Sequence, residues 1–314
     1  MLHVTPKTEK TAVLLLAHGS PDSVDEVPAF LLQVTGGRPL PPQVVQEVQH
    51  RYGLIGKSPL TELTLKQGEL LARELGLPVY VGMRNWKPFV ADAVRQMTTD
   101  GIERAVVICL APQNSRTSVG LYRVALNSAN NSAFATEFVE SWHDHPLLIK
   151  AFTERLHAGW KHACSDMGAK VPVIFTAHSV PQRTIAEGDP YETQAKETAA
   201  LVAGEATLGT NDWVFAFQSQ GMSGGTWLGP TVEDTIRSFK DKGHHGVFIQ
   251  PIGFLCDHVE VLYDIDIGFK QFAEKEGMRL WRAQSLNDSP RLAAALADIA
   301  RSRLGWKSGA SAPR

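Results

Sequence analysis

The sequence is short of cysteine. Its 314 residues include only three, Cys109, Cys164 and Cys256, and no two of them form a C-x-x-C pair. A sparse, odd and widely spaced set argues against a disulfide framework, a structural zinc site and a cysteine-ligated iron–sulfur cluster. We therefore expect no iron–sulfur cluster, and a reducing compartment, the cytoplasm, as the location of the protein.

Long apolar runs and an excess of charge of one sign are also missing. The formal net charge is −2, which does not suggest nucleic acid or an anionic membrane as a partner. No apolar run approaches the roughly 18 residues of a membrane-spanning helix. The run Ala12–Ala17 follows Lys7 and Lys10 as in a signal peptide, but it is short and ends in His-Gly-Ser-Pro without a cleavage pattern. We expect a soluble protein without a transmembrane segment.

Phosphate-binding motifs are absent as well. The glycine-rich stretch "SQGMSGGTWLGP", residues 219–230, follows an expected strand. It lacks the Gly-Lys-Ser/Thr of a P-loop, and it does not open a helix as G-x-G-x-x-G. The sequence therefore gives little support to nucleotide binding.

Short apolar runs that alternate with helical patterns make up most of the chain. "AVLLLA", "PVYVGM" and "RAVVICLAP" occur in the first half, and "PVIFTAHS", "WVFAFQS" and "GVFIQPIGF" in the second. Fully apolar strands separated by helices are typical of parallel sheets covered on both faces. The pattern predicts an α/β protein.

The two halves also echo each other. "TAVLLLAHGSPDS" begins at Thr11, "VPVIFTAHSVPQR" begins at Val171, and each runs an apolar segment into Ala-His. This indicates a duplicated unit, with residues 1–148 as the first lobe and residues 149–287 as the second. Two such lobes facing each other would place the carboxyl ends of their strands around one cleft, where open α/β sheets bind ligands.

Two histidines, His18 and His178, stand where these apolar segments end. An imidazole at the mouth of a cleft can act as a base, an acid or a metal ligand near neutral pH. The simpler alternative is a histidine packed at a strand end and hydrogen-bonded to the backbone. Of the aromatic residues in loop-like contexts, Tyr122 and Trp227 could wall a flat apolar ligand or belong to the core.

The stretch "CDHVEVLYDIDIGFKQF", residues 256–272, predicts a helix that begins near Asp257. Asp257, Glu260 and Asp264 are three and four residues apart, so their carboxylates would share one helical face. Such oxygen donors, with a nearby imidazole, could hold or relay a divalent iron, zinc or nickel ion. Equally, Asp257 could cap the helix, and the other two could be solvated acids at its positive end.

Together these segments resemble the ferrochelatases, which insert ferrous iron into a porphyrin. The resemblance runs from about Ala12 to Leu304, and the order of "AHSVP", "WLGP" and "DHVEVLYD" is its most specific part. Longer matching segments are "AHGSPDSVDEV", "RYGLIGKSPLTELT", "VGMRNWKPFVADAV", "FTAHSVPQRTIAEGDPYETQAKET", "FQSQGMSGGTWLGP" and "PIGFLCDHVEVLYDIDI". The resemblance implies two facing Rossmann-like lobes with the porphyrin between them, and a C-terminal helix, residues 288–314, that returns to the first lobe.

The resemblance also implies roles for three residues of the second half. His178 matches the histidine that binds the metal or takes up the pyrrole protons, and Glu260 matches its carboxylate partner. These two would be the metal ligands, and Asp264 would be a step in a metal or proton relay. His178 would be the reacting copy of the repeated turn.

Other positions would contact the porphyrin. Arg51, Tyr52, Ser58 and Tyr122 match residues that hold the propionates or line the pocket, and Trp227 would form an aromatic wall. Guanidinium and hydroxyl groups suit carboxylates. The other copy of the turn places His18 where bacterial members often carry tyrosine, so we expect it to line the opposite porphyrin face.

The predicted function is iron insertion in haem biosynthesis, with Fe²⁺ as a substrate and no tightly bound cofactor. Coproporphyrin III is the preferred porphyrin, because the match to the short, cluster-free bacterial form is best. Protoporphyrin IX remains an alternative, because "PAFLLQV", residues 28–34, is apolar enough to contact a more hydrophobic porphyrin. The rivals are a cobalt or nickel chelatase of a related tetrapyrrole and a non-catalytic carrier of haem or porphyrin. A carrier would need neither His178 nor Glu260.

Beyond porphyrin and Fe²⁺, we expect no nucleic-acid partner, and we expect a monomer. Transient contact with a membrane or with another enzyme of the haem pathway stays open. The family's basic run after its first helix is reduced here to Arg38, which weakens any inference about propionate contacts at that place.

Overall fold

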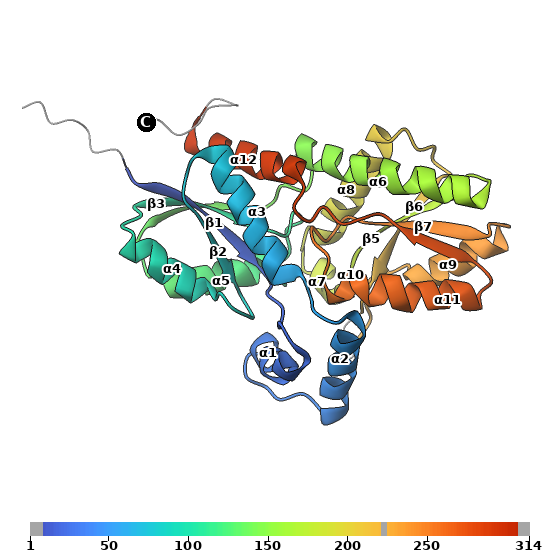
Figure 1. Cartoon of the computed structure of the whole chain (residues 1–314), viewed down its shortest axis with the longest axis horizontal. Helices are drawn as coiled ribbons and strands as arrows, with labels where there is room; N and C mark the ends of the chain where they lie inside the picture. The colour runs from blue at the N-terminus through green and yellow to red at the C-terminus, as the bar shows by residue number, and fades with distance from the viewer. Residues whose placement is uncertain (1–8, 221–224, 307–314) are drawn as a thin grey trace, which may run out of the picture.

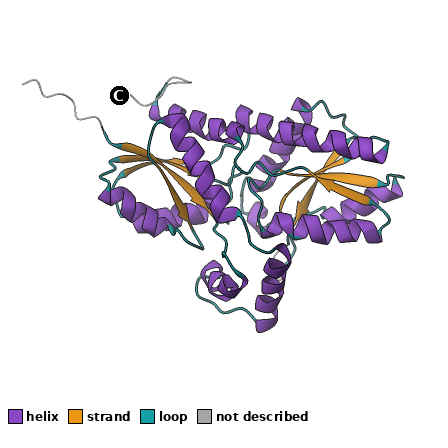
Figure 2. Cartoon of the chain, in the orientation of Figure 1, coloured by secondary structure: helices purple, strands orange, loops and turns teal. Residues whose placement is uncertain are grey.

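The computed structural model of the chain describes residues 9–220 and 225–306. These residues form two lobes, each a parallel β-sheet flanked by helices (Figure 1, Figure 2). The two-lobe α/β architecture predicted from the alternating apolar runs is therefore confirmed.

The first lobe contains a four-stranded sheet with the order β2-β1-β3-β4. Its neighbouring strands are all parallel, so each return to the sheet needs a crossover connection. The strands span Thr11–Ala17 (β1), Val79–Met83 (β2), Arg104–Cys109 (β3) and Ala135–Val139 (β4). The crossover helices span Leu60–Leu75 (α3), Val90–Thr99 (α4) and Val119–Asn130 (α5).

The second lobe repeats this plan with the order β6-β5-β7-β8, again parallel throughout. Its strands span Val173–His178 (β5), Trp213–Gln218 (β6), Gly246–Pro251 (β7) and Arg279–Arg282 (β8). Its helices span Gln182–Ala186 (α7), Tyr191–Glu205 (α8), Val232–Asp241 (α9), Val259–Leu262 (α10) and Lys270–Lys275 (α11). A π-helical turn, η2 (Asp264–Phe269), lies between α10 and α11.

The equal strand order supports the duplication seen in the sequence. In each sheet the first strand of the lobe lies inside, between the second and the third. These inner strands, β1 and β5, are almost wholly buried because their apolar side chains face helices on both sides. Both strands reach their carboxyl ends at Ala-His, so the repeated turn is the same structural position in two lobes.

Two long helices connect the lobes. Helix α6 (Pro146–Met167) leads into the second lobe, and α12 (Pro290–Leu304) packs against α3 of the first lobe and against α6. Arg301 of α12 donates a hydrogen bond to the main-chain oxygen of Glu74 at 2.8 Å. The helix therefore contacts the first lobe, although the boundary between residues 148 and 149 stays a prediction.

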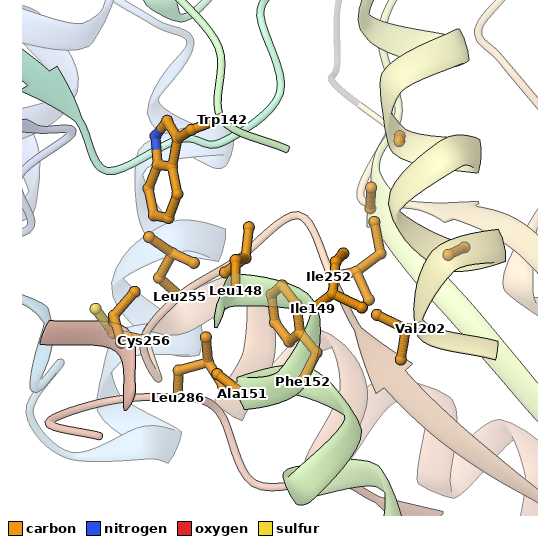
Figure 3. Packing of buried hydrophobic residues seen from close by; sticks show 14 of the residues in the cluster. Trp142, Leu148, Ile149, Ala151, Phe152, Val202, Ile252, Leu255, Cys256 and Leu286 are labelled. Carbon is orange, nitrogen blue, oxygen red and sulfur yellow. The ribbon is translucent and has the colours of Figure 1, made fainter. Parts of the chain in front are cut away.

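The largest hydrophobic core reaches into both lobes, since it includes Val13 of β1 and Phe175 of β5. Figure 3 shows its centre, where side chains of α6 meet those of loops from the second lobe. The labelled residues there include Leu148, Phe152, Ile252, Leu255 and Leu286. This shared core fixes the two lobes against each other on the side of α6.

One segment of the first lobe stands apart from its sheet. A 3₁₀ turn, η1 (Val24–Glu26), is followed by α1 (Val27–Val34) and α2 (Pro42–Ile55). The two helices project below the lobes and pack against each other (Figure 1). Each has proline in its first turn, where the missing N–H costs nothing.

Candidate functional site

A cavity of about 680 Å³ lies between the lobes, at the carboxyl ends of the inner strands. Its walls come from both lobes and from α1 and α2. Eight of the nine site residues predicted from the sequence line it: His18, Arg51, Tyr52, Tyr122, His178, Trp227, Glu260 and Asp264. The ninth, Ser58, is 1% exposed and lies outside this lining.

His178 and Glu260 face each other across a short gap. His178 is the last residue of β5, and its Nε2 lies 3.3 Å from Oε1 of Glu260 in α10. Enclosure by the protein lowers the pKa of His178, but the Glu260 carboxylate, together with the Ser179 main-chain oxygen and Asp264, outweighs this and raises that pKa to about 9. Enclosure raises the pKa of Glu260, yet His178 and His258 bring it well below its ordinary value. At neutral pH His178 and Glu260 therefore form an ion pair.

His258 is a site residue that the sequence analysis missed. Its Nε2 lies 3.4 Å from Oε2 of Glu260, so the carboxylate stands between two imidazoles. The residue precedes α10 in an extended conformation, with φ −162°. On a regular helix, positions two apart point in different directions, and only this extended start brings His258 onto Glu260. The sequence signal was a histidine two residues before the acid in "DHVEV".

The backbone fixes the tautomer of both imidazoles. Nδ1 of His178 lies against the main-chain oxygen of Ser179, and Nδ1 of His258 lies 3.1 Å from that of Cys256. A carbonyl oxygen only accepts hydrogen bonds, so each Nδ1 carries its hydrogen. In its neutral form each ring therefore leaves Nε2 without a hydrogen, and both Nε2 atoms face Glu260.

Asp264, the first residue of η2, is a second carboxylate in the cavity wall that contains Glu260. One carboxylate oxygen accepts a hydrogen bond from the Ser219 hydroxyl, and the other lies 3.7 Å from a guanidinium nitrogen of Arg51. Burial raises the pKa of Asp264, the Ser219 bond opposes this, and the nearby negative charge of Glu260 raises it further. The two acids thus differ, because Glu260 ionises more readily than usual and Asp264 less readily.

Asp257 is not part of this wall, which corrects the expectation of three carboxylates on one face. Its oxygens accept hydrogen bonds from Ser285 at 2.7 Å and from Asn287 at 2.8 Å, and Arg282 lies 3.3 Å away. The reason is local, since α10 begins only at Val259, and the helical spacing of three does not apply to Asp257. Asp257 therefore anchors the segment that follows β8, through Ser285 and Asn287.

The opposite wall is built from the first lobe. His18 is exposed to the cavity, and its Nδ1 lies 2.9 Å from the main-chain oxygen of Gly19. Enclosure lowers the pKa of His18, opposed by this backbone contact, so the ring is neutral near pH 7. The Tyr52 hydroxyl lies 3.0 Å from that of Ser20, and burial raises the pKa of Tyr52.

Arg84 is the second residue that the sequence analysis missed. It follows β2 and lines the cavity, with its guanidinium 6.0 Å from the centre of the Tyr122 ring. Within the described residues no carboxylate lies at ion-pair distance from it, and its buried Nε has no hydrogen-bond partner. Burial lowers the pKa of Arg84, but a guanidinium stays charged. The signal was an arginine directly after a strand in "VGMRN".

Within the described ranges, 9–220 and 225–306, no group of three or more histidine, cysteine, aspartate or glutamate residues has an arrangement that could hold a metal ion. No helix in these ranges combines the length and apolar character needed to cross a membrane.

The family model described as ferrochelatase matches residues 10–304. The ferrochelatase of Acidobacterium capsulatum is 54% identical over 97% of this chain and 98% of its own length. That of Deinococcus radiodurans is 39% identical over 91% of this chain and 94% of its own length. The coproporphyrin III ferrochelatase of a Geobacillus species is 34% identical, over 94% of this chain and 98% of its own length.

The solved structures show the fold. The sirohydrochlorin chelatase SirB from Bacillus subtilis subspecies spizizenii, in complex with cobalt, superposes with a TM-score of 0.53 at 11% sequence identity. The match covers 94% of this chain and 95% of that chain. Two four-stranded parallel sheets flanked by helices are thus the chelatase fold.

Proposed function

The chain belongs to the ferrochelatase family and inserts iron into a porphyrin in haem biosynthesis, and we propose that His178 and Glu260 carry this reaction. The observation behind the proposal is the 3.3 Å contact between His178 Nε2 and Glu260 Oε1 inside the cavity. An imidazole that can take up a proton and a carboxylate that can hold a cation are the two groups that the reaction requires.

The stoichiometry explains why one base is not enough. A porphyrin gives up two N–H protons for each Fe²⁺ that it accepts, so two protons must leave in every turnover. Both imidazoles line the cavity, and both expose Nε2 on the side of Glu260. We therefore assign His178 as the acceptor of one pyrrole proton and His258 as the acceptor of the other.

Before iron binds, the pKa of His178, about 9, means that its Nε2 already carries a proton at neutral pH. Arriving Fe²⁺ would change this, because its double positive charge replaces the imidazolium as the counterion of Glu260. The proton then leaves and Nε2 becomes free to serve the metal or the porphyrin. Iron and proton compete, so the KM for Fe²⁺ falls as the pH rises toward 9.

For the porphyrin we propose coproporphyrin III, whose carboxylates outnumber those of protoporphyrin IX. The support is chemical, since Arg51 and Arg84 bring positive charge to the cavity and guanidinium groups bind carboxylates well. Several relatives are named coproporphyrin III ferrochelatase. Protoporphyrin IX is the second candidate because Phe30, Leu31 and Val34 of α1 add an apolar wall.

The test is anaerobic Fe²⁺ insertion with the two porphyrins in parallel, using the wild type, His178→Ala and Glu260→Gln. We expect a higher kcat/KM with coproporphyrin III and a loss of kcat of at least about 100-fold in both variants. Unchanged kcat in His178→Ala would refute its role as the base. A preference for protoporphyrin IX would refute the substrate assignment and leave the role of His178 untouched.

A further inference from the structure

A second connection between the lobes lies beside the cavity, at the start of α8. The loop at residues 113–118 follows β3 of the first lobe, and several of its residues line the cavity, among them Gln113, Thr117 and Ser118. Gln194 of α8 accepts a hydrogen bond from the main-chain nitrogen of Asn114 at 2.6 Å. The loop is thus held by the second lobe while it faces the porphyrin space.

Asp189, just before α8, is the centre of this connection. Its Oδ2 accepts hydrogen bonds from the Ser115 hydroxyl at 3.1 Å and from the main-chain nitrogen of Arg116 at 2.7 Å. Its Oδ1 accepts one from the main-chain nitrogen of Tyr191 at 3.0 Å. One carboxylate thereby joins the cavity loop of the first lobe to the first residue of a helix in the second.

Tyr191 extends this connection to His178, the proposed base. Its side chain is buried and lines the cavity, and its hydroxyl donates a hydrogen bond to the main-chain oxygen of His178 at 3.0 Å. His178 ends β5, where the sheet no longer holds it on the β7 side, since that pairing stops at Thr176. The Tyr191 hydroxyl therefore holds the main chain of His178 at the carboxyl end of β5.

We propose that Asp189 and Tyr191 are positioning residues, which tie the porphyrin-facing loop of the first lobe to His178 in the second. The inference rests on the proposed role of His178. If so, the position of the His178 imidazole depends on the hydrogen bonds that hold the loop at residues 113–118. The two lobes then act on one substrate as a unit.

The variants follow from the geometry. Asp189→Asn keeps the size of the side chain but replaces an acceptor oxygen by an NH₂ group, which must then face an N–H or O–H donor. Tyr191→Phe removes only the hydroxyl on His178. Glu187→Gln is the matched control, because it removes an exposed ion pair to the Arg116 side chain of the same loop and leaves the hydrogen bonds of Asp189 and Tyr191 in place.

Anaerobic Fe²⁺ insertion into coproporphyrin III is measured for each variant, and rates are normalised to the folded fraction from circular dichroism. We expect kcat to fall roughly 10-fold in Tyr191→Phe with the KM for porphyrin unchanged. Asp189→Asn lowers kcat similarly and raises that KM about 3–10-fold, because it frees the loop as well. Glu187→Gln stays within about twofold of the wild type.

The double variant decides whether the two residues act along one path. Its kcat should lie near that of the single variants, about 10-fold below the wild type, rather than about 100-fold below as for independent sites. Multiplying losses, or wild-type kcat in Tyr191→Phe, would overturn the proposal. If Asp189→Asn does not fold, Ser115→Ala tests the same contact from the loop side, and an unchanged KM there would also overturn it.

His178→Ala is assayed alongside to separate this inference from the proposed function. If His178→Ala is inactive and both positioning variants behave like the wild type, the inference fails and the proposed function stands. If His178→Ala is as active as the wild type, the proposed function fails first.

Discussion

The clearest consequence of the site concerns the charge on His178. Its pKa of about 9 depends on the carboxylate at 3.3 Å, because enclosure alone would lower the pKa below the ordinary 6.5. Glu260→Gln keeps the shape of the side chain and removes its charge. We therefore expect the titration midpoint of His178 to fall well below the wild-type value of about pH 9 in the variant, where only Ser179 and Asp264 still oppose the effect of burial.

The measurement is an NMR titration of the imidazole resonances in the porphyrin-free protein. The chain has 11 histidines, so His178 is assigned by the signal that His178→Ala lacks. Glu197→Gln is the control, because it removes another carboxylate, 2.9 Å from His143 Nε2, outside the cavity. A His178 midpoint that stays near pH 9 in Glu260→Gln would refute the electrostatic argument.

The same pair makes a prediction about stability, and its sign follows from linkage. A group whose pKa is raised on folding stabilises the native state fully below its unfolded pKa, and this is lost as the pH rises through the folded value. For His178 the window runs from 6.5 to about 9. Glu260 stays ionised throughout this window because its pKa is depressed. The Tm of the wild type should therefore fall relative to that of Glu260→Gln between pH 6.5 and 9.

Three further substitutions separate binding from structure. Arg84→Ala should raise the KM for the porphyrin roughly 10–100-fold, the effect of losing one charge-assisted hydrogen bond of about 1.5–3 kcal/mol, and an unchanged KM would show that Arg84 does not contact the substrate. Ser58→Ala should change that KM less than about twofold and leave the Tm no lower, because its buried hydroxyl has no partner among the described residues; a large rise in KM would contradict its position outside the cavity. Asp257→Ala should lower the free energy of unfolding by about 1–3 kcal/mol and spare kcat, since its partners Ser285 and Asn287 are structural, whereas lost activity at unchanged Tm would return Asp257 to the reacting site.

The fold was predictable because its signals are local. A fully apolar run of six or seven residues between helical patterns has few solutions other than a buried parallel strand, and β1 and β5 are such strands. The repeated Ala-His turn correctly indicated two equivalent strand ends. Their order in each sheet depends on long-range packing, and no short stretch of sequence encodes it.

The site was predictable only in part, for physical reasons that differ from residue to residue. Helical spacing related Glu260 to Asp264 but misplaced Asp257, because the helix starts later than the spacing assumes. His258 escaped notice because its contact depends on one extended residue before α10. Arg84 escaped notice because an unpaired guanidinium is visible only when its surroundings are known.

The two strand-end histidines show what the duplicated fold supplies and what it does not. In both lobes Nδ1 lies against the main-chain oxygen of the next residue, Gly19 for His18 and Ser179 for His178. The repeat thus provides two imidazoles with the same tautomer, facing one cavity from opposite walls. Yet the pKa of His18 is lowered and that of His178 is raised. The backbone contact is common to both, so the difference follows mainly from Glu260, which hydrogen-bonds to His178 alone of these two, while Asp264 further raises the pKa of His178 and Arg84 lowers that of His18. With the proposed role of His178, an acid on one wall would make proton uptake one-sided, and we expect the duplicated fold to act on an almost planar substrate from a single face.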